Sequence, residues 1–296
     1  MSEIERVGVV GAGLMGAGIA EVCARAGCDV LVVEQYRDGL EHGRDRLLTS
    51  LDRAVHSGKL SSAEREKAAW RLRWSTDLGD LADRQLVIEA VTEDEQIKTE
   101  AVAMISKVLT DPDAIIASNT SSIPIMKLGT ATDRPGHVIG LHFFNPVPVL
   151  PLVEVVASLT TNPRTRDRVE SFVTRRLGKQ TIRSSDRSGF VVNALLVPYL
   201  IAAIRMVESG AATPADVDSG MKLGCAHPMG PLELADLIGL DTVMAIAESM
   251  YEEYREPLYA PPLLRRMIEA GLYGRKTGRG FHGYPSKTHP RAEVAV

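Results

Sequence analysis

The stretch that decides the fold is Val7-Gly8-Val9-Val10-Gly11-Ala12-Gly13-Leu14-Met15-Gly16. It opens with a short apolar run of the kind found in buried parallel strands, and a glycine turn follows at once. Helical sequence continues to about Ala26, where Gly27 can end the helix, and residues 30–33 are typical of a second strand. A strand, a glycine turn, a helix and a strand within about thirty residues predict a βαβ unit.

The glycines of this turn are the ones that a dinucleotide-binding loop requires. Gly11 permits a tight turn, Gly13 lets a pyrophosphate approach the backbone, and Gly16 lets the helix pack closely on the strand. The start of the helix, at Leu14 and Met15, supplies amide donors and a partial positive charge for phosphates. The motif therefore predicts a dinucleotide cofactor.

An acidic residue, Glu34, ends the second strand. A carboxylate at this place can hydrogen-bond a ribose diol and would repel a 2′-phosphate, which favours NAD over NADP. The alternative interpretation is a surface glutamate at a strand end. Arg37 lies close enough in the sequence to leave some room for NADP.

Strands and helices alternate along the next part of the chain. Two polar helices, at about 38–57 and 61–72, are expected to form a hairpin that projects from the sheet, and Ser61 with Glu64 fits a capping box. Further strands are predicted at 86–89, 114–117, 137–141, 152–156 and 180–182, with helices at about 94–109 and 164–177. This alternation predicts a mostly parallel, doubly wound, Rossmann-like sheet that is covered on both faces.

The pattern changes near Asp186-Arg187-Ser188-Gly189, after which only helices are expected, at 190–209, 214–223, 231–254 and 262–270. We therefore predict an α/β domain over residues 1–187 and an all-α domain over 188–296. The first half of the 190–209 helix carries no charge, which indicates burial by its own domain or by a partner subunit. Residues 289–296 are expected to fray.

Composition narrows the class of protein. The chain has 296 residues, of which 45% are hydrophobic and 24% charged, as in an ordinary soluble globular protein. A net charge of −4 argues against a nucleic-acid partner. The three cysteines show neither metal-site nor disulfide spacing, and the chain shows neither a signal peptide nor a membrane span. We expect a cytoplasmic protein with no metal and no membrane association.

His142 directly follows the apolar strand predicted at 137–141. Glu154 lies further along the chain, within the strand predicted at 152–156. Histidine exchanges protons near neutral pH, and ligands of doubly wound sheets bind at the carboxyl edge of the strands. Glu154 could hold the second ring nitrogen and favour the imidazolium. A histidine of this kind is by itself more often a structural residue, so the interpretation depends on its place at the sheet edge.

Three motifs together resemble the 3-hydroxyacyl-CoA dehydrogenase family, in particular its short-chain 3-hydroxybutyryl-CoA members from actinobacteria. They are the glycine loop, Ser118-Asn119-Thr120-Ser121-Ser122, and Leu141-His142-Phe143-Phe144-Asn145-Pro146 with the later Val153-Glu154-Val155. The resemblance runs from Val7 to about Tyr284 and includes a GFVVN segment ending at Asn193. It implies NAD-dependent oxidation of (S)-3-hydroxyacyl-CoA to 3-ketoacyl-CoA, and the reverse reduction.

The resemblance also implies roles for single residues. His142 takes the hydroxyl proton and returns it, Glu154 orients His142, Ser121 hydrogen-bonds the C3 oxygen, and Asn193 positions the substrate. Further contacts to the cofactor are implied for Glu93, Lys98, Asn145 and Lys276. The plainer alternatives are turn chemistry for Ser121, a solvated helix start for Glu93 and Lys98, and a basic loop for Lys276.

Two residues depart from the pattern common in the family. Ala194 stands where many members have arginine, and Pro151 where many have lysine, so that both departures remove a positive charge near the site. The CoA-facing residues of the hairpin have no secure match, and Arg53, with Arg46 and Lys59, is a basic candidate. The resemblance implies a homodimer formed through the C-terminal helices. The alternatives are a dehydrogenase of a sugar acid or carnitine, and a binding or structural protein without catalysis.

Overall fold

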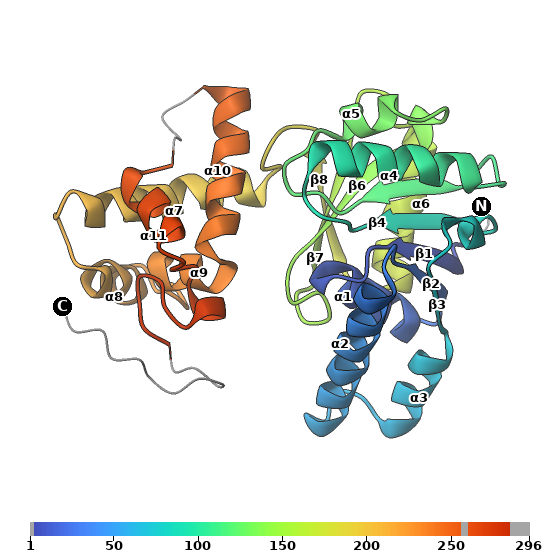
Figure 1. The fold of residues 1–296 in the computed structure, drawn as a ribbon, viewed down its shortest axis with the longest axis horizontal. Coiled ribbons are helices and arrows are strands. Elements are labelled where there is room, and N and C mark those ends of the chain that lie inside the picture. Colours follow the sequence, from blue (N-terminus) through green and yellow to red (C-terminus); the bar gives the residue numbers. More distant parts are fainter. Residues whose placement is uncertain (1–2, 256–259, 285–296) are drawn as a thin grey trace. The chain divides into compact units, whose positions relative to one another are not determined.

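The computed structural model describes residues 3–255 and 260–284, and the chain divides into two compact units, Met1–Phe190 and Val191–Val296 (Figure 1). Each unit has an apolar core of its own. The tail at 289–296, for which fraying was expected, lies outside the described residues. The helices of the described residues are too short or too polar to cross a membrane.

The first unit is built on one eight-stranded sheet with the order β3-β2-β1-β4-β5-β6-β7-β8. The strands are β1 (Arg6–Val10), β2 (Asp29–Val33), β3 (Leu72–Ser75), β4 (Leu86–Glu89), β5 (Ile115–Ser118), β6 (Val138–Phe143), β7 (Leu152–Ala157) and β8 (Gln180–Ser185). Neighbouring strands pair in parallel except for β6 and β7, which are antiparallel. The predicted Rossmann-like sheet is confirmed.

Helices cover both faces of this sheet. They are α1 (Leu14–Arg25), α2 (Arg37–His56), α3 (Ser62–Trp70), α4 (Glu95–Val108), α5 (Ile125–Thr130) and α6 (Pro163–Ser171), with short 3₁₀ and π turns between them. Successive strand residues belong to different apolar clusters: Val9 packs in one and Val10 in the other. This alternation places one cluster on each face. Figure 1 shows α2 and α3 extending away from the sheet as a hairpin.

One strand was missed by the sequence interpretation. The helix predicted over 61–72 ends earlier, because α3 stops at Trp70 and Leu72 begins β3. β3 is only four residues long and pairs with β2 alone, from Val30↔Leu72 to Val33↔Ser75. Such a short edge strand is fixed by its partner strand and not by its own periodicity, and so the local pattern did not reveal it.

The second unit is helical, as predicted. Its helices are α7 (Val192–Glu208), α8 (Pro214–Gly224), α9 (Pro231–Ile238), α10 (Leu240–Tyr254) and α11 (Pro262–Glu269). The single helix predicted over 231–254 is wrong, since the chain breaks at Gly239 into α9 and α10. Gly239 has a φ of +104°, which a residue with a side chain rarely adopts. The break lets α9 and α10 pack around one core.

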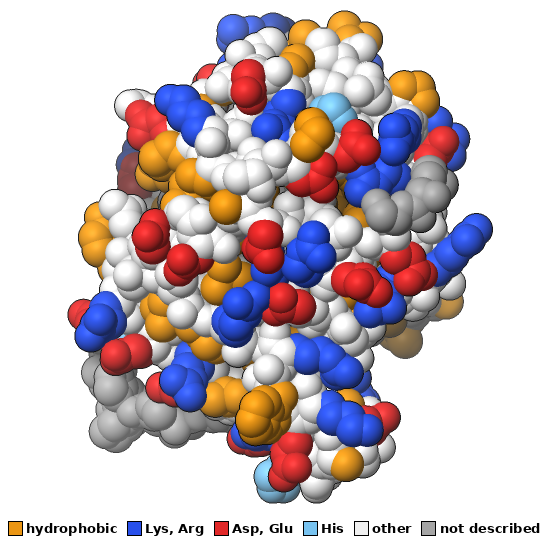
Figure 2. Space-filling view, turned by 90° about the vertical axis from the view of Figure 1, so that its right-hand side faces the viewer, with side chains coloured by type: hydrophobic (Ala, Val, Ile, Leu, Met, Phe, Trp, Pro, Cys, Tyr) orange, Lys and Arg blue, Asp and Glu red, His pale blue; other side chains and the backbone are white. Residues whose placement is uncertain are grey.

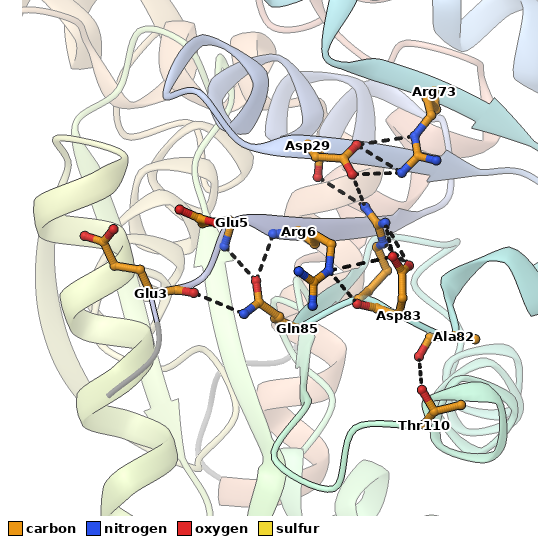
Figure 3. Close-up of polar contacts among 10 residues, drawn as sticks. Glu3, Glu5, Arg6, Asp29, Arg73, Ala82, Asp83, Gln85 and Thr110 are labelled. Carbon is orange, nitrogen blue, oxygen red and sulfur yellow. Dashed lines mark hydrogen bonds and ion pairs between the residues drawn. The ribbon is translucent and has the colours of Figure 1, made fainter.

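A polar network closes the amino edge of the sheet (Figure 3). Arg84, which is 1% exposed, precedes β4 and donates to Asp29 at 3.1 Å and to Asp83 at 2.8 Å. The side chain of Gln85 accepts from the backbone N–H of Arg6 at 3.0 Å. These contacts join β1, β2 and β4 at the end of the sheet opposite to the glycine loop.

The surface carries charges of both signs. Figure 2 shows acidic and basic side chains intermixed over the face that it views. The whole chain has 38 acidic and 34 basic residues, so that neither sign can dominate its surface strongly.

The capping box predicted at the start of the second hairpin helix is confirmed. The Ser61 hydroxyl accepts from the Glu64 N–H at 3.2 Å, and the Glu64 carboxylate accepts from the Ser61 N–H at 2.8 Å. Loss of such a cap costs about 1 kcal/mol. We expect Ser61→Ala to lower the free energy of unfolding by about that amount, measured by urea denaturation. A free energy equal to that of the wild type would contradict a stabilising cap.

Candidate active site

The glycine loop after β1 is closely packed except at one position. Gly11 has a φ of +98°, and a Cβ there would lie 2.6 Å from the carbonyl oxygen of Ala90. A Cβ at Gly16 would overlap the carbonyl oxygen of Gly11. A Cβ at Gly13, in contrast, would meet no atom within 4 Å. Close packing therefore requires glycine at Gly11 and Gly16. The loop is open at Gly13, where a pyrophosphate would approach the backbone.

Glu34 lies directly beside this loop. Its Oε2 accepts a hydrogen bond from the backbone N–H of Ala12 at 2.9 Å, which holds the carboxylate at the end of β2. Arg46 of α2 donates to the carbonyl oxygen of Ala12 at 3.2 Å. Leu14 and Met15 begin α1, with Leu14 57% exposed. Arg37 is exposed in the first turn of α2.

His142 and Glu154 face each other across β6 and β7. The two residues are register partners in the antiparallel ladder, and His142 Nδ1 lies 2.6 Å from Glu154 Oε2. His142 is 7% exposed and Glu154 is 0% exposed. The rings of Phe144 and Phe190 lie 4.5 and 5.6 Å from the histidine ring, centroid to centroid. Because Nδ1 is occupied by the carboxylate, Nε2 is the ring nitrogen available to a substrate.

The turn after β5 is organised around the carboxylate of Glu93. Its Oε1 accepts from the Thr120 hydroxyl at 2.6 Å, from the Ser121 N–H at 2.7 Å and from the Ser121 hydroxyl at 3.1 Å. Burial raises the pKa of Glu93, but the Lys98 ammonium and the hydrogen bonds from Thr120 and Ser121 outweigh it, so that the pKa lies below its usual range. Ser121 is thus held by an ionised carboxylate.

A buried ion pair lies behind this turn. Lys98 of α4 is 1% exposed, and its ammonium donates to Glu89 Oε1 at 2.7 Å and lies 3.3 Å from Glu93 Oε2. Glu89, the last residue of β4, is 0% exposed and accepts from the Ser118 hydroxyl at 2.5 Å. The sequence interpretation named Lys98 and Glu93 but missed Glu89 and Ser118.

Asn119 makes a further contact that the sequence interpretation missed. Its Oδ1 accepts from the backbone N–H of Phe143 at 3.0 Å, and the side chain is 8% exposed. The contact joins the end of β5 to the residue after His142. An asparagine that directly follows an apolar strand at the carboxyl edge of the sheet was the available signal.

A cavity of about 560 Å³ lies between α1, α2 and the loop after β6. Asn145, exposed, lines it together with Val147 and Pro148. The basic side chains around it are those of Arg25, Arg46, Arg53 and Lys59. The cavity therefore brings Asn145 and Arg53, two predicted contact residues, to one place in the first unit.

Two predicted site residues belong to the second unit. Asn193 lies in the first turn of α7 and is 8% exposed. The ammonium of Lys276 is held by both carboxylate oxygens of Asp241, each at 2.6 Å. His227 Nδ1 lies 3.2 Å from the Tyr199 hydroxyl, a contact within the same unit.

With this geometry established, similarity to known proteins identifies the family. Residues 6–187 match the 3-hydroxyacyl-CoA dehydrogenase NAD binding domain, and residues 189–284 match the C-terminal domain of the same family. The chain belongs to the 3-hydroxyacyl-CoA dehydrogenase family, and its first unit is an NAD-binding domain. The predicted family and the predicted cofactor class are both confirmed.

Individual relatives agree with this assignment. A 3-hydroxybutyryl-CoA dehydrogenase of Mycobacterium tuberculosis is 60% identical over 282 residues, which cover 95% of this chain and 99% of that protein. The crystal structure of FadB2 from M. tuberculosis has a TM-score of 0.95 at 59% identity, covering 96% of this chain and all of that one. (S)-3-hydroxybutyryl-CoA dehydrogenase PaaH1 from Ralstonia eutropha has a TM-score of 0.90 at 44% identity, with the same coverage.

The loop geometry separates a functional glycine from a structural one. In Gly13→Ala the added methyl group enters open space, so the melting temperature should stay that of the wild type, while the Kd for NADH rises about tenfold or more. In Gly16→Ala the methyl group meets backbone, which should cost about 1–3 kcal/mol of stability. Thermal denaturation and NADH fluorescence titration measure both effects. An undiminished NADH affinity in Gly13→Ala would show that phosphates do not bind there.

Glu34 should decide cofactor choice, because its carboxylate accepts from ribose hydroxyls and repels a 2′-phosphate. We expect a higher kcat/KM with NADH than with NADPH for the native protein, and a smaller ratio for Glu34→Ala. Initial rates with each cofactor at fixed substrate give the ratio. A native preference for NADPH would contradict the assignment and point to Arg37.

Proposed function

We propose that this chain is an NAD-dependent 3-hydroxybutyryl-CoA dehydrogenase, which oxidises (S)-3-hydroxybutyryl-CoA to acetoacetyl-CoA and catalyses the reverse reduction. The observation that carries the proposal is the 2.6 Å contact of His142 with Glu154, in a member of the 3-hydroxyacyl-CoA dehydrogenase family. The high identity to 3-hydroxybutyryl-CoA dehydrogenases supports the short acyl chain.

In this proposal His142 is the acid–base residue. Nε2 accepts the proton of the substrate hydroxyl during oxidation and returns it to the C3 oxygen during reduction. Glu154, buried against Nδ1, fixes the ring and stabilises the imidazolium that forms. Phe144 and Phe190 pack against the ring and limit its rotation and the access of water.

Ser121 and Asn193 position the substrate. The Ser121 hydroxyl donates to Glu93 Oε1 at 3.1 Å when no substrate is bound, and in reduction it would turn this single proton to the substrate's C3 oxygen while the Ser121 N–H stays on Glu93. Asn193 contributes an amide from the start of α7, in the helical domain whose boundary we place at 187–188. A buried amide of this kind needs hydrogen-bond partners, which the substrate would supply.

NAD, when bound, supplies the hydride acceptor at its nicotinamide ring, and NADH the hydride donor. The residues present fit such a cofactor, because the loop is open at Gly13 and Glu34 stands at the end of β2. Glu93, Lys98 and Asn145 are the remaining contacts that we assign to it in the first unit, and Lys276 is the one in the second.

The acyl-CoA substrate carries several phosphate groups and needs a basic surface. The cavity with Arg53, Arg46 and Lys59 on its rim supplies three cations in the first unit, and it supports Arg53 as a CoA contact.

We further propose a homodimer formed through the C-terminal helices. Exposed apolar side chains on those helices, such as Leu195 at 73% and Leu223 at 87%, support it.

The direct test is a spectrophotometric assay of acetoacetyl-CoA with NADH, followed by competition with free CoA. We expect turnover of acetoacetyl-CoA and competitive inhibition by CoA. Turnover of a sugar acid or of carnitine without CoA inhibition would favour the non-CoA alternative. Absence of turnover with intact NADH binding would favour a binding protein that lacks catalysis.

Replacement of the proposed acid–base residue tests the mechanism. His142→Ala should fold and bind NADH as the wild type does, and its kcat should fall by about 10²–10⁴-fold, the usual contribution of a general acid–base residue. Circular dichroism and NADH titration provide the controls. A variant that retains more than about a third of the wild-type kcat would remove His142 from the mechanism.

A further inference from the structure

We propose that Glu89 is a positioning residue, which sets the orientation of Ser121 through Lys98 and Glu93. The inference rests on the proposed function, because Ser121 is the residue that we assign to the C3 oxygen of the substrate. Neither Glu89 nor the Ser118 hydroxyl beside it contacts the Ser121 hydroxyl directly. Their effect would pass through the buried pair of Glu89 and Lys98 to Glu93, whose side chain is 36% exposed.

Glu89 lies at the centre of the carboxyl edge of the sheet. It ends β4, whose neighbours are β1 on one side and β5 on the other. The carboxylate is 0% exposed, and it accepts from the Ser118 hydroxyl at 2.5 Å and from the Val91 N–H at 2.7 Å. A carboxylate so deeply buried has to be compensated by a cation and by hydrogen bonds, which fix its position.

The cation is Lys98, and it bridges two carboxylates. Its ammonium lies 2.7 Å from Glu89 Oε1 and 3.3 Å from Glu93 Oε2, and it also donates to the carbonyl oxygen of Val91 at 3.2 Å. The shorter contact is the one to Glu89. The position of the ammonium is therefore set mainly by Glu89. Its attraction to Glu93 is weaker, because the distance between the charges is longer.

Glu93 connects Lys98 to Ser121. Since Lys98 faces Oε2, Glu93 presents Oε1 to the turn after β5, where both the N–H and the hydroxyl of Ser121 donate to it. The Thr120 hydroxyl shares the same oxygen. Rotation or displacement of this one carboxylate would therefore change the direction in which the Ser121 hydroxyl points.

Loss of the charge of Glu89 should disturb this chain in a definite direction. The buried ammonium of Lys98 would keep a single carboxylate partner, Glu93, and would be drawn closer to it. A stronger pull on Glu93 competes with its hydrogen bonds to Ser121. The turn would then lose the short contact that anchors the Ser121 N–H, and the hydroxyl would no longer be held in place for the substrate, while the fold persists.

The chain offers a matched control just before the same strand. Arg84, on the amino side of β4, is 1% exposed and pairs with Asp29 at 3.1 Å and with Asp83 at 2.7 Å (Figure 3). Arg84→Gln removes a buried charge of similar burial, at the end of the sheet opposite to Ser121. It reports the stability cost of removing a buried charge from its ion pairs, here with partners 43% and 61% exposed, without a change at the site.

The experiment compares Glu89→Gln with Arg84→Gln by melting temperature and by kcat/KM for acetoacetyl-CoA at saturating NADH. We expect both variants to lose stability. We expect kcat/KM to fall about tenfold or more in Glu89→Gln and less than about twofold in Arg84→Gln. Equal kcat/KM losses in the two variants, or an unchanged kcat/KM in Glu89→Gln, would overturn the proposal.

A charge-neutral pair separates positioning from stability. In Glu89→Gln/Lys98→Met both buried charges are gone, so the melting temperature should return toward that of the wild type. Because Lys98 is itself assigned to the cofactor, Lys98→Met at saturating NADH is the reference. Adding Glu89→Gln to it should lower kcat/KM no further, because both changes interrupt the same chain. Recovery of kcat/KM together with stability would make Glu89 a structural residue only.

A milder variant keeps the proposal testable if Glu89→Gln fails to fold. Ser118→Ala frees one carboxylate oxygen of Glu89, and we expect kcat/KM to fall by about threefold to tenfold, the effect of one hydrogen bond. No change in this variant would overturn the proposal. An inactive wild type would instead overturn the proposed function, so the two failures are distinguishable.

Discussion

The ladder between β6 and β7 is the constraint on which the proposed chemistry depends. Among the strands described, this pair is the antiparallel one, and it places His142 and Glu154 directly opposite each other. Partners in such a ladder point to the same face of the sheet, with their Cβ atoms about 4.5–5.5 Å apart. The register of the two strands is therefore decisive, because a one-residue slip of either strand would send Glu154 to the opposite face.

Local features of the sequence carried most of the fold. The βαβ unit at the start could be predicted because each of its signals, an apolar run, a glycine turn and an acid at the strand end, lies within a short stretch. The capping box at Ser61 and Glu64 is local in the same sense. The family motifs also predicted the order of the two domains and the NAD-binding character of the first domain, because these motifs are recognised in the sequence itself.

Features that depend on distant partners could not be predicted. β3 exists because β2 pairs with it, and the break at Gly239 reflects how α9 and α10 share a core. The role of Glu89 at the site could not be predicted for the same reason. Its residue type could be read from the sequence, but its burial and its contact with Lys98 arise only when β4, β5 and α4 assemble. A strand-end glutamate carries no mark that separates it from a solvated one.

The two outer strands have a consequence for behaviour at high concentration. An open sheet presents unpaired backbone groups along both margins, and another chain can add to them and start aggregation. Here the outer strands β3 and β8 each carry an arginine near the middle, Arg73 and Arg183, with side chains 58% and 62% exposed. β3 is also too short to template a long strand. The fold thus keeps an unclosed sheet compatible with a crowded, protein-rich solution.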